Sequence, residues 1–407
     1  MKGFIMFLTP EEKISYLRKK YDITQSELSS VEIKRQFIGM IEIGKRSLTK
    51  NTAEIISKNF NEILKKRKIE EKITTAYLLE TKEEQALKKL YKILENQNMK
   101  NDIEIEICFL ELEDLKRKEL SFLLGKFYFD LKEIELSKKY FEIALYLYKP
   151  LENIEILLYL SRIYYYLNQF KETVDLIKNY IFSLIKNPTE DNLKILYNYG
   201  YSLYKIDEIE SSIEILKKLL KLCKTEDLSF KVKNMLAVIY YLKLNKHKLA
   251  LKIYKEIFEN SNQENRLVIY GNYLEMWLSL KKEIEIEKVI EEIEIFLKNY
   301  QTSPDHLFKI YVLIGKCYAE LNLEKEANAY YVKALNISDN KLTPIENKYD
   351  ILLRMLNFNN LKEGELDSII KNFFILFEEK QDYKIAINFI KKVKSETKKL
   401  QILEKLN

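Results

Sequence analysis

Small and aromatic residues recur along this chain at a nearly constant spacing, and this recurrence restricts the fold more than any other feature. One window contains Gly125, Tyr128, Ser137, Phe141 and Ala144, and a second contains Gly315, Tyr318, Ala327, Tyr331 and Ala334 at the same separations. Weaker copies place the first, or anchor, position at 161, 200, 237 and 274, which gives steps of 36, 39, 37, 37 and 41 residues. A period of this length indicates a repeat array, in which each unit buries its apolar face against the next.

The positions of the prolines agree with these anchor positions and indicate that each repeat begins with a helix. Pro150, Pro188, Pro304 and Pro344 precede anchor positions 161, 200, 315 and an inferred 355 by 11, 12, 11 and 11 residues. Each proline therefore falls where a helix would begin, which is the helical position that tolerates proline. The chain has only 8 Gly and 5 Pro among 407 residues, too few for the turns of a sandwich, a barrel or a Gly-looped α/β enzyme. The predicted fold class is all-α.

The repeated spacing resembles the tetratricopeptide repeat, which places Leu-Gly, Tyr, a small residue, an aromatic residue and Ala at these positions. The clearest copies are residues 118–148 and 308–338. The resemblance implies a right-handed α-solenoid of helix pairs over residues 69–407, with a concave face that is lined by the first helices and binds extended segments.

The first 68 residues have different signals, which predict four short helices. Pro10 follows the predicted cap Thr9, and Thr24 with Glu27 forms a capping box that opens a second helix. A third helix is expected over residues 33–42, and Thr49 is expected to cap a fourth helix.

The run from Ile23 to Leu28, followed by Ile38, Ile41, Glu42, Gly44, Lys45 and Arg46, resembles the Cro/lambda-repressor (XRE) helix-turn-helix family across about residues 9–64. The turn at 30–33 is one residue shorter than the family pattern. The resemblance implies a DNA-binding domain over residues 1–68, in which Thr24 and Gln25 approach a phosphate. The same resemblance places Lys34, Arg35 and Gln36 in the major groove and Lys45 and Arg46 on the other backbone edge.

The charge distribution agrees with a binder of a polyanion. Residues 10–68 contain fourteen basic and eight acidic side chains, an excess of six positive charges, whereas residues 69–407 are close to neutral. A basic domain joined to a neutral helical body fits nucleic-acid binding. The alternative reading is an ordinary solvated surface in a lysine-rich chain.

Polar residues recur on the predicted inner face of the repeats. Asn198, Asn234 and Asn272 occupy nearly the same place in successive units, and an amide can both donate to and accept from the backbone of an extended peptide. Tyr159, Arg162 and Tyr201 are expected beside them. The alternative is that the aligned asparagines are a coincidence in an Asn-rich chain and that the tyrosines only pack.

An XRE domain followed by tetratricopeptide repeats resembles the RRNPP group of regulators, which implies a quorum-sensing type of control by a short signalling peptide or protein segment. The implied partners are double-stranded DNA, that peptide and a second copy in a homodimer. The competing hypothesis is an interaction scaffold whose helix-turn-helix no longer reads DNA.

Motifs for catalysis, metal binding and export are weak. His247 and His306 lack a carboxylate or cysteine at useful spacing, and the sequence contains no Walker loop, dinucleotide fingerprint or HExxH motif. Cys108, Cys223 and Cys317 are too far apart for a disulfide framework or a metal site. The apolar start, Met1 to Leu8, is too short for a signal segment or a membrane span, whether Met1 or Met6 is the initiator. We expect a cytoplasmic protein that is not an enzyme and needs no cofactor, metal or membrane.

Overall fold

A computed structural model describes residues 7–96, 101–148, 152–337, 345–359 and 361–406. Met1, Met6, Pro150 and Pro344 lie outside the described residues. Within the described ranges every regular element is an α-helix and no strand occurs, so the all-α prediction is confirmed. Of the helices described, none combines the length and the apolarity that a membrane crossing requires.

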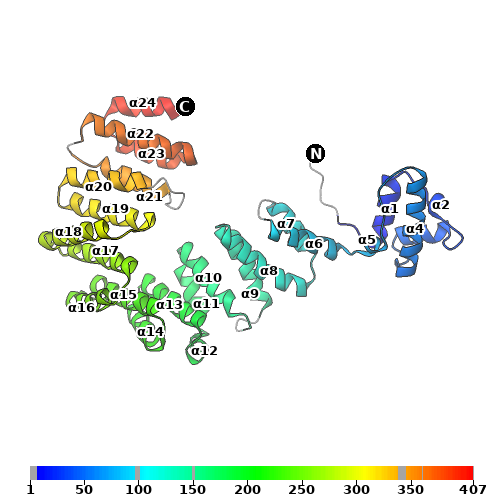
Figure 1. Cartoon of the computed structure of the whole chain (residues 1–407), viewed down its shortest axis with the longest axis horizontal. Helices are drawn as coiled ribbons and strands as arrows, with labels where there is room; N and C mark the ends of the chain where they lie inside the picture. Colours follow the sequence, from blue (N-terminus) through cyan, green and yellow to red (C-terminus); the bar gives the residue numbers. More distant parts are fainter. Residues whose placement is uncertain (1–6, 97–100, 149–151, 338–344, 360, 407) are drawn as a thin grey trace. The chain divides into compact units, whose positions relative to one another are not determined.

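The chain divides into two compact units, Met1–Ser202 and Leu203–Asn407. The helices of the first unit, coloured blue to green in Figure 1, are α1 (Pro10–Lys20), α2 (Gln25–Leu28), α3 (Arg35–Glu42), α4 (Lys50–Lys66), α5 (Thr75–Leu79), α6 (Lys82–Glu95), α7 (Asp102–Leu110), α8 (Asp114–Asp130), α9 (Ile134–Leu147), α10 (Ile154–Tyr166), α11 (Phe170–Ile177), α12 (Ile181–Lys186) and most of α13 (Glu190–Lys205).

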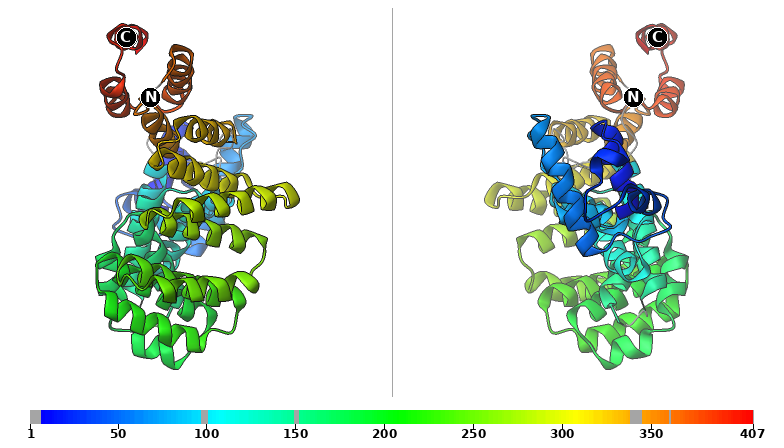
Figure 2. Two further views of the ribbon diagram at one scale, coloured as in Figure 1. Left: turned by 90° about the vertical axis from the view of Figure 1, so that its left-hand side faces the viewer. Right: turned by 90° about the vertical axis from the view of Figure 1, so that its right-hand side faces the viewer.

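The second unit begins near the end of α13 and is also helical. Its helices are α14 (Ile209–Leu222), α15 (Glu226–Leu242), α16 (His247–Glu259), α17 (Gln263–Ser279), α18 (Glu283–Asn299), α19 (Pro304–Glu320), α20 (Glu324–Ile337), α21 (Ile345–Met355), α22 (Glu363–Lys380), α23 (Tyr383–Lys392) and α24 (Glu396–Leu406). Helices that are close together in the chain pack against each other in this unit, from green through yellow to red (Figure 2).

Helices α1 to α4 form a small bundle, which we call the head (residues 7–68). Thr9 and Thr24 close capping boxes with Glu12 and Glu27, and Thr49 caps α4, as predicted. The third helix begins at Arg35, two residues later than expected, because Lys34 is its N-cap and Ile33 is buried in the preceding turn.

The core of the head does not end with α4. Its buried apolar side chains are Ile14, Leu17, Ile23, Leu28, Ile33, Ile38, Ile41, Leu48, Ala53, Ile56, Phe60 and Leu64, and Ile73 and Leu78 complete the same cluster. The core therefore continues past residue 68, where the sequence places the domain boundary. We call residues 69–85 the clasp.

Lys13 joins the head to the clasp. This lysine is fully buried, and its Nζ donates to the carbonyl oxygens of Tyr77 and Glu80, both at 2.6 Å, and lies 3.5 Å from Oε2 of Glu80. Burial lowers the pKa of the Lys13 ammonium, whereas the Glu80 carboxylate raises it. The ammonium satisfies carbonyl groups at the end of α5 that have no partner within the helix.

Two side-chain amides add further contacts between the head and the clasp. Asn61 donates to the carbonyl oxygen of Ile73 at 2.7 Å and accepts from its N–H at 2.8 Å. Gln85 makes the same paired contact with the backbone of Leu8, at 2.8 and 3.4 Å. Each amide thus pairs with both the backbone N–H and the backbone C=O of one residue, as a neighbouring strand would.

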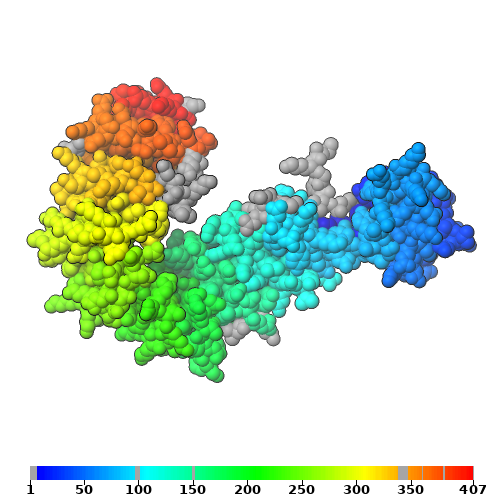
Figure 3. All heavy atoms as spheres, in the orientation of Figure 1, coloured from blue at the N-terminus to red at the C-terminus, as the bar shows by residue number. Residues whose placement is uncertain are grey.

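The repeats follow the predicted phase. Anchor positions 125, 161, 200, 237, 274 and 315 lie in α8, α10, α13, α15, α17 and α19, as predicted. Within the two units the helix pairs are α8–α9, α10–α11, α15–α16, α17–α18 and α19–α20, and α13 is followed along the chain by α14. The long step from 161 to 200 contains an additional short helix, α12, which the sequence did not predict. Within each unit the colours of Figure 3 change gradually, because each pair packs on its sequence neighbours.

Each of these first helices ends with the same backbone turn. A non-glycine residue with positive φ follows the helix at Lys132, Asn168, Asp207, Asn245, Lys281 and Asn322. In five of the six turns the next residue donates its N–H to the carbonyl five positions earlier, as Glu133 does to Tyr128 and Leu323 to Tyr318. This is the Schellman cap, which turns the chain sharply into the second helix.

Close packing explains the glycines at two anchor positions. A Cβ atom on Gly125 would lie 2.8 Å from the ring of Phe141, and one on Gly315 would lie 2.6 Å from the ring of Tyr331. Both rings are buried, so neither can move away at low cost. The glycine and the aromatic residue therefore act as a pair, in which the ring fills the space that a side chain would occupy.

Replacing Lys13 by Met should weaken the junction between α1 and α5. The substitution removes the donor of the Tyr77 carbonyl and the closer donor of the Glu80 carbonyl, and it leaves Lys88 as the remaining cation beside the Glu80 carboxylate. We expect a cost of about 1–3 kcal/mol. Hydrogen exchange at the amides of α1 and α5 should become much faster. Lys19→Met is the matched control because Lys19 lies in the same helix and is exposed. Equal protection in the two variants would contradict this role of Lys13.

Replacing Gly315 by Ala should destabilise the second unit in spite of the better helix propensity of Ala. Overpacking against Tyr331 costs about 1–3 kcal/mol, and about 1 kcal/mol of propensity offsets part of it. The control is Gly364→Ala in α22, where an added Cβ meets nothing within 4 Å. Thermal unfolding should show a lower midpoint for the first variant and an unchanged or higher midpoint for the second.

Candidate functional site

The exposed basic residues of the head surround the start and the end of α3. Lys34, Arg35 and Gln36 occupy the N-cap and the first turn, where their side chains are exposed. Lys45 and Arg46 follow Gly44, whose φ of +70° ends the helix in a Schellman cap, with Lys45 N–H donating to the carbonyl of Met40 at 2.8 Å. Among the described residues, none of these five side chains forms an ion pair or a hydrogen bond.

The first turn of α3 has no carboxylate to compete with an anion. Lys34 makes no side-chain cap, and the turn contains no acidic residue, whereas the first turns of α1 and α2 both contain glutamate. The positive end of the helix dipole and the two cationic side chains therefore add their attraction for a phosphate or for a base edge.

Thr24 is occupied by the helix cap. Its hydroxyl accepts from the N–H of Glu27 at 3.1 Å and donates to the Glu27 carboxylate at 2.9 Å. The pKa of Glu27 is lowered, mainly because the Thr24 N–H donates to its carboxylate. Thr24 thus positions α2, and contact with a phosphate stays a prediction for this residue.

Gln25 takes part in a partly buried polar cluster. Its amide donates to Oε2 of Glu42 at 2.6 Å, and Arg18 donates to both oxygens of the same carboxylate at 2.6 and 3.0 Å. The exposed fractions of the Arg18 and Glu42 side chains are 16% and 7%. The cluster links α1, α2 and α3, so it fixes the angle at which α3 is presented.

The sequence did not identify Arg18 and Lys13 as structural residues. Both lie in a helix with several basic residues, and no local pattern separates Arg18 from the exposed Lys19. Glu42 is part of the motif that resembles the XRE family, which was the one signal that pointed to its importance.

A second candidate site is a small cavity in the first unit, between α10 and α13. Its volume is about 220 Å³, and its lining residues are Arg162, Tyr165, Tyr166, Tyr197, Asn198 and Tyr201. Three of the predicted peptide-binding residues, Arg162, Asn198 and Tyr201, thus meet at one cavity. Tyr159 does not line it, because its ring stacks on Phe141 at a centroid distance of 4.8 Å.

The asparagines connect successive first helices. Asn198 of α13 donates to the hydroxyl oxygen of Ser161 in α10 at 2.8 Å. Within the second unit, Asn272 of α17 donates to the amide oxygen of Asn234 in α15 at 2.6 Å. All three are partly exposed, so the remaining groups of each amide stay accessible. Their contact with a peptide stays a prediction.

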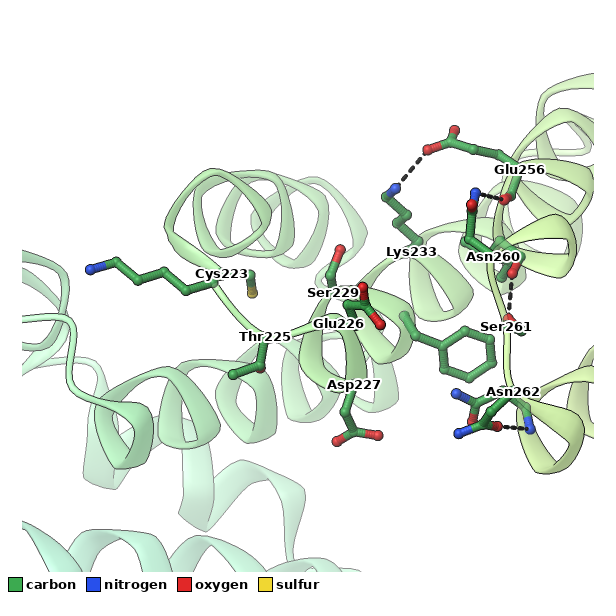
Figure 4. Close-up of a pocket in the computed structure, with 14 residues that line it drawn as sticks. Cys223, Thr225, Glu226, Asp227, Ser229, Lys233, Glu256, Asn260, Ser261 and Asn262 are labelled. Atoms are coloured by element: carbon green, nitrogen blue, oxygen red, sulfur yellow. Dashed lines mark hydrogen bonds and ion pairs between the residues drawn. The ribbon is translucent and has the colours of Figure 1, made fainter.

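In a larger cavity of the second unit, several polar side chains of the lining are paired with each other. The cavity has a volume of about 560 Å³ and is shown in Figure 4, where Lys233 pairs with Glu256 at 2.6 Å and Asn260 donates to the Glu256 carbonyl at 3.0 Å. Burial raises the pKa of the Cys223 thiol at its edge, which disfavours a reactive thiolate. In the described part of the chain, no three potential metal ligands come together.

Comparisons with known proteins identify the repeats. The family model for the tetratricopeptide repeat matches residues 119–150, 193–226 and 308–341. This chain carries tetratricopeptide repeats. Two matches coincide with the clearest predicted copies, and the third covers a copy that the sequence pattern showed more weakly. No curated protein matches the sequence.

Solved structures agree with the fold. A tetratricopeptide repeat protein from Parabacteroides merdae is similar over 68% of this chain and 99% of its own, with 17% identity and a TM-score of 0.50, which is a likeness of fold alone. Bacillus thuringiensis PlcR, solved with the peptide PapR7 and DNA, aligns over 95% of this chain and 99% of its own, with 14% identity. Its TM-score is 0.30, so that alignment carries no argument.

Replacing Glu42 by Gln should loosen the head. Arg18 would lose the charge on its partner in a site where both side chains are largely buried, at a cost of about 2–4 kcal/mol. The expected result is a lower unfolding midpoint for the head in urea. Glu54→Gln removes an exposed carboxylate from α4 and should leave the midpoint unchanged. Equal midpoints for both variants would mean that the cluster does not stabilise α3.

Proposed function

We propose that this chain is a DNA-binding transcription regulator whose repeats bind a short peptide or a protein segment that changes DNA binding. The observation that carries the proposal is which arginines of the head form ion pairs with glutamates. Arg18 and Arg67 pair with glutamates inside the head, whereas Arg35 and Arg46 are exposed and form no ion pair with any described residue. The two arginines without an internal partner are those that the resemblance assigns to DNA.

The surroundings of α3 support the same function. A guanidinium pairs with guanine O6 and N7, and a glutamine amide pairs with adenine N6 and N7, so Arg35 and Gln36 at the start of a helix suit a major groove. Lys45 and Arg46 would hold the phosphate backbone. The Glu42 cluster keeps α3 in one orientation, which sequence recognition requires. The proposal includes a cytoplasmic homodimer on a palindromic site.

The scaffold alternative has one observation in its favour. Gln25, which the resemblance assigns to a phosphate, directs its amide to Glu42 instead. Selection of binding sites by the full chain from a pool of random double-stranded DNA at physiological salt separates the two functions. A regulator enriches a motif, and a scaffold enriches none.

Two substitutions in the head should have different effects on the selected DNA. Arg35→Ala should relax specificity at one base pair, with a loss of about 1–3 kcal/mol of discrimination. Lys45→Ala should weaken binding to all sequences and lower the slope of log K against log salt by about 1. Lys186→Ala, an exposed charge in α12, is the control for both. A uniform loss of affinity in Arg35→Ala, with unchanged specificity, would place that residue on the backbone instead.

A further inference from the structure

The cavity between α10 and α13 has one cationic group and no acidic one. Its lining contains Arg162, an asparagine and four tyrosines, without Asp or Glu. The cavity of about 560 Å³ in the second unit differs in this respect, since Glu226, Asp227 and Glu256 line it beside its lysines. A negatively charged group would therefore meet no repulsion from the walls around Arg162.

Packing holds the guanidinium of Arg162 in place without neutralising its charge. The guanidinium carbon lies 4.8 Å from the ring centre of Phe129 and 5.8 Å from that of Tyr159. The side chain is exposed and forms no ion pair with any described residue. An aromatic surface orients a guanidinium and leaves its N–H groups free to bind a planar anion, and a carboxylate fits this fork in a bidentate way.

The walls of the cavity suit the apolar atoms and the peptide N–H of the residue that carries the carboxylate. Tyr165 contacts Tyr201 at a centroid distance of 5.2 Å, and Tyr165 and Tyr166 are about half exposed. Asn198 is held by its bond to Ser161, while its amide oxygen makes no hydrogen bond with a described residue and can accept from a peptide N–H. Aromatic rings offer apolar contact at a small cost in conformational entropy.

The volume limits what can enter. Cavities that take drug-sized ligands measure roughly 300–1,000 Å³, whereas this one measures about 220 Å³. It therefore accommodates one residue or terminal group, with the rest of a segment outside.

We infer that this cavity binds a carboxylate on a peptide segment, with Arg162 as its anchor and the tyrosines around the adjoining apolar atoms. The inference rests on the proposed function, because it names the chemistry that the repeats recognise in their ligand. The carboxylate has two sources of the same chemistry, the C-terminus of a peptide or an acidic side chain within it.

Two libraries of random hexapeptides test the inference, one with free C-terminal carboxylates and one with C-terminal amides. Each is passed over immobilised full-length protein, and the retained peptides are identified by mass spectrometry. The wild type should retain carboxylate-bearing peptides, and Arg162→Gln should retain at least tenfold less. Arg162→Lys should keep part of the retention, because it keeps the charge without the fork. Lys171→Gln removes an exposed charge from α11 and should retain as much as the wild type.

The outcomes distinguish a C-terminal carboxylate from an acidic side chain, and they test the inference separately from the proposed function. Retention confined to free acids identifies a C-terminus, and retention of amidated peptides rich in Asp or Glu identifies a side chain, provided that Arg162→Gln removes it in either case. Equal retention by Arg162→Gln and the wild type, with matching thermal unfolding, overturns the inference and leaves peptide binding standing. If the wild type retains nothing from either library, both the inference and the peptide part of the proposed function are wrong.

Discussion

A buried ammonium group holds the head of this protein against the first helices that follow it. Lys13 of α1 reaches the carbonyl oxygens at the end of α5, where a helix leaves its last carbonyls without partners. A lysine is rarely buried unless its charge is balanced, and here two carbonyl groups and the Glu80 carboxylate balance it. Separating α1 from α5 would expose all these groups at once, so the head and the clasp move together.

Under the proposed function, this junction would connect ligand binding in the repeats to the head within the first unit. Buried side chains of α6, α7, α8 and α9 form one cluster, and those of α8, α9 and α10 form the next. A ligand between α10 and α13 would thus bind to a body whose packing continues toward the clasp. Under the proposed function, such a ligand favours one arrangement of the stacked helices and so one position of the head.

Local rules in the sequence predicted much of the fold. Thr9, Thr24 and Thr49 cap the helices that they precede, and each of the six anchor positions lies in a helix of the predicted phase. Both signals depend on residues a few positions apart. The residues that hold these helices together were not predictable in this way. Arg18 and Glu42 are 24 positions apart, and Lys13 and Glu80 are 67 apart.

The same distinction between local signals and distant contacts applies to the residues of the candidate sites. Exposure of Arg35 and Arg46 followed from their place around a short helix. The hydrogen-bond partners of Gln25 and Asn198 could not be predicted from the sequence. Both partners lie in other helices, and the distance to those helices is known only from the folded structure. Asn198 was expected to serve a peptide, and it also joins α13 to α10 through Ser161.

The distance between the head and α6 tests the central claim most directly. Spin labels at Lys58 in α4 and Lys92 in α6, both exposed, can be placed after the three native cysteines are replaced. Pulsed electron paramagnetic resonance of the full chain should give one narrow distance distribution, because the clasp holds the two helices in one body. A broad distribution, as a flexible linker would produce, would contradict this account.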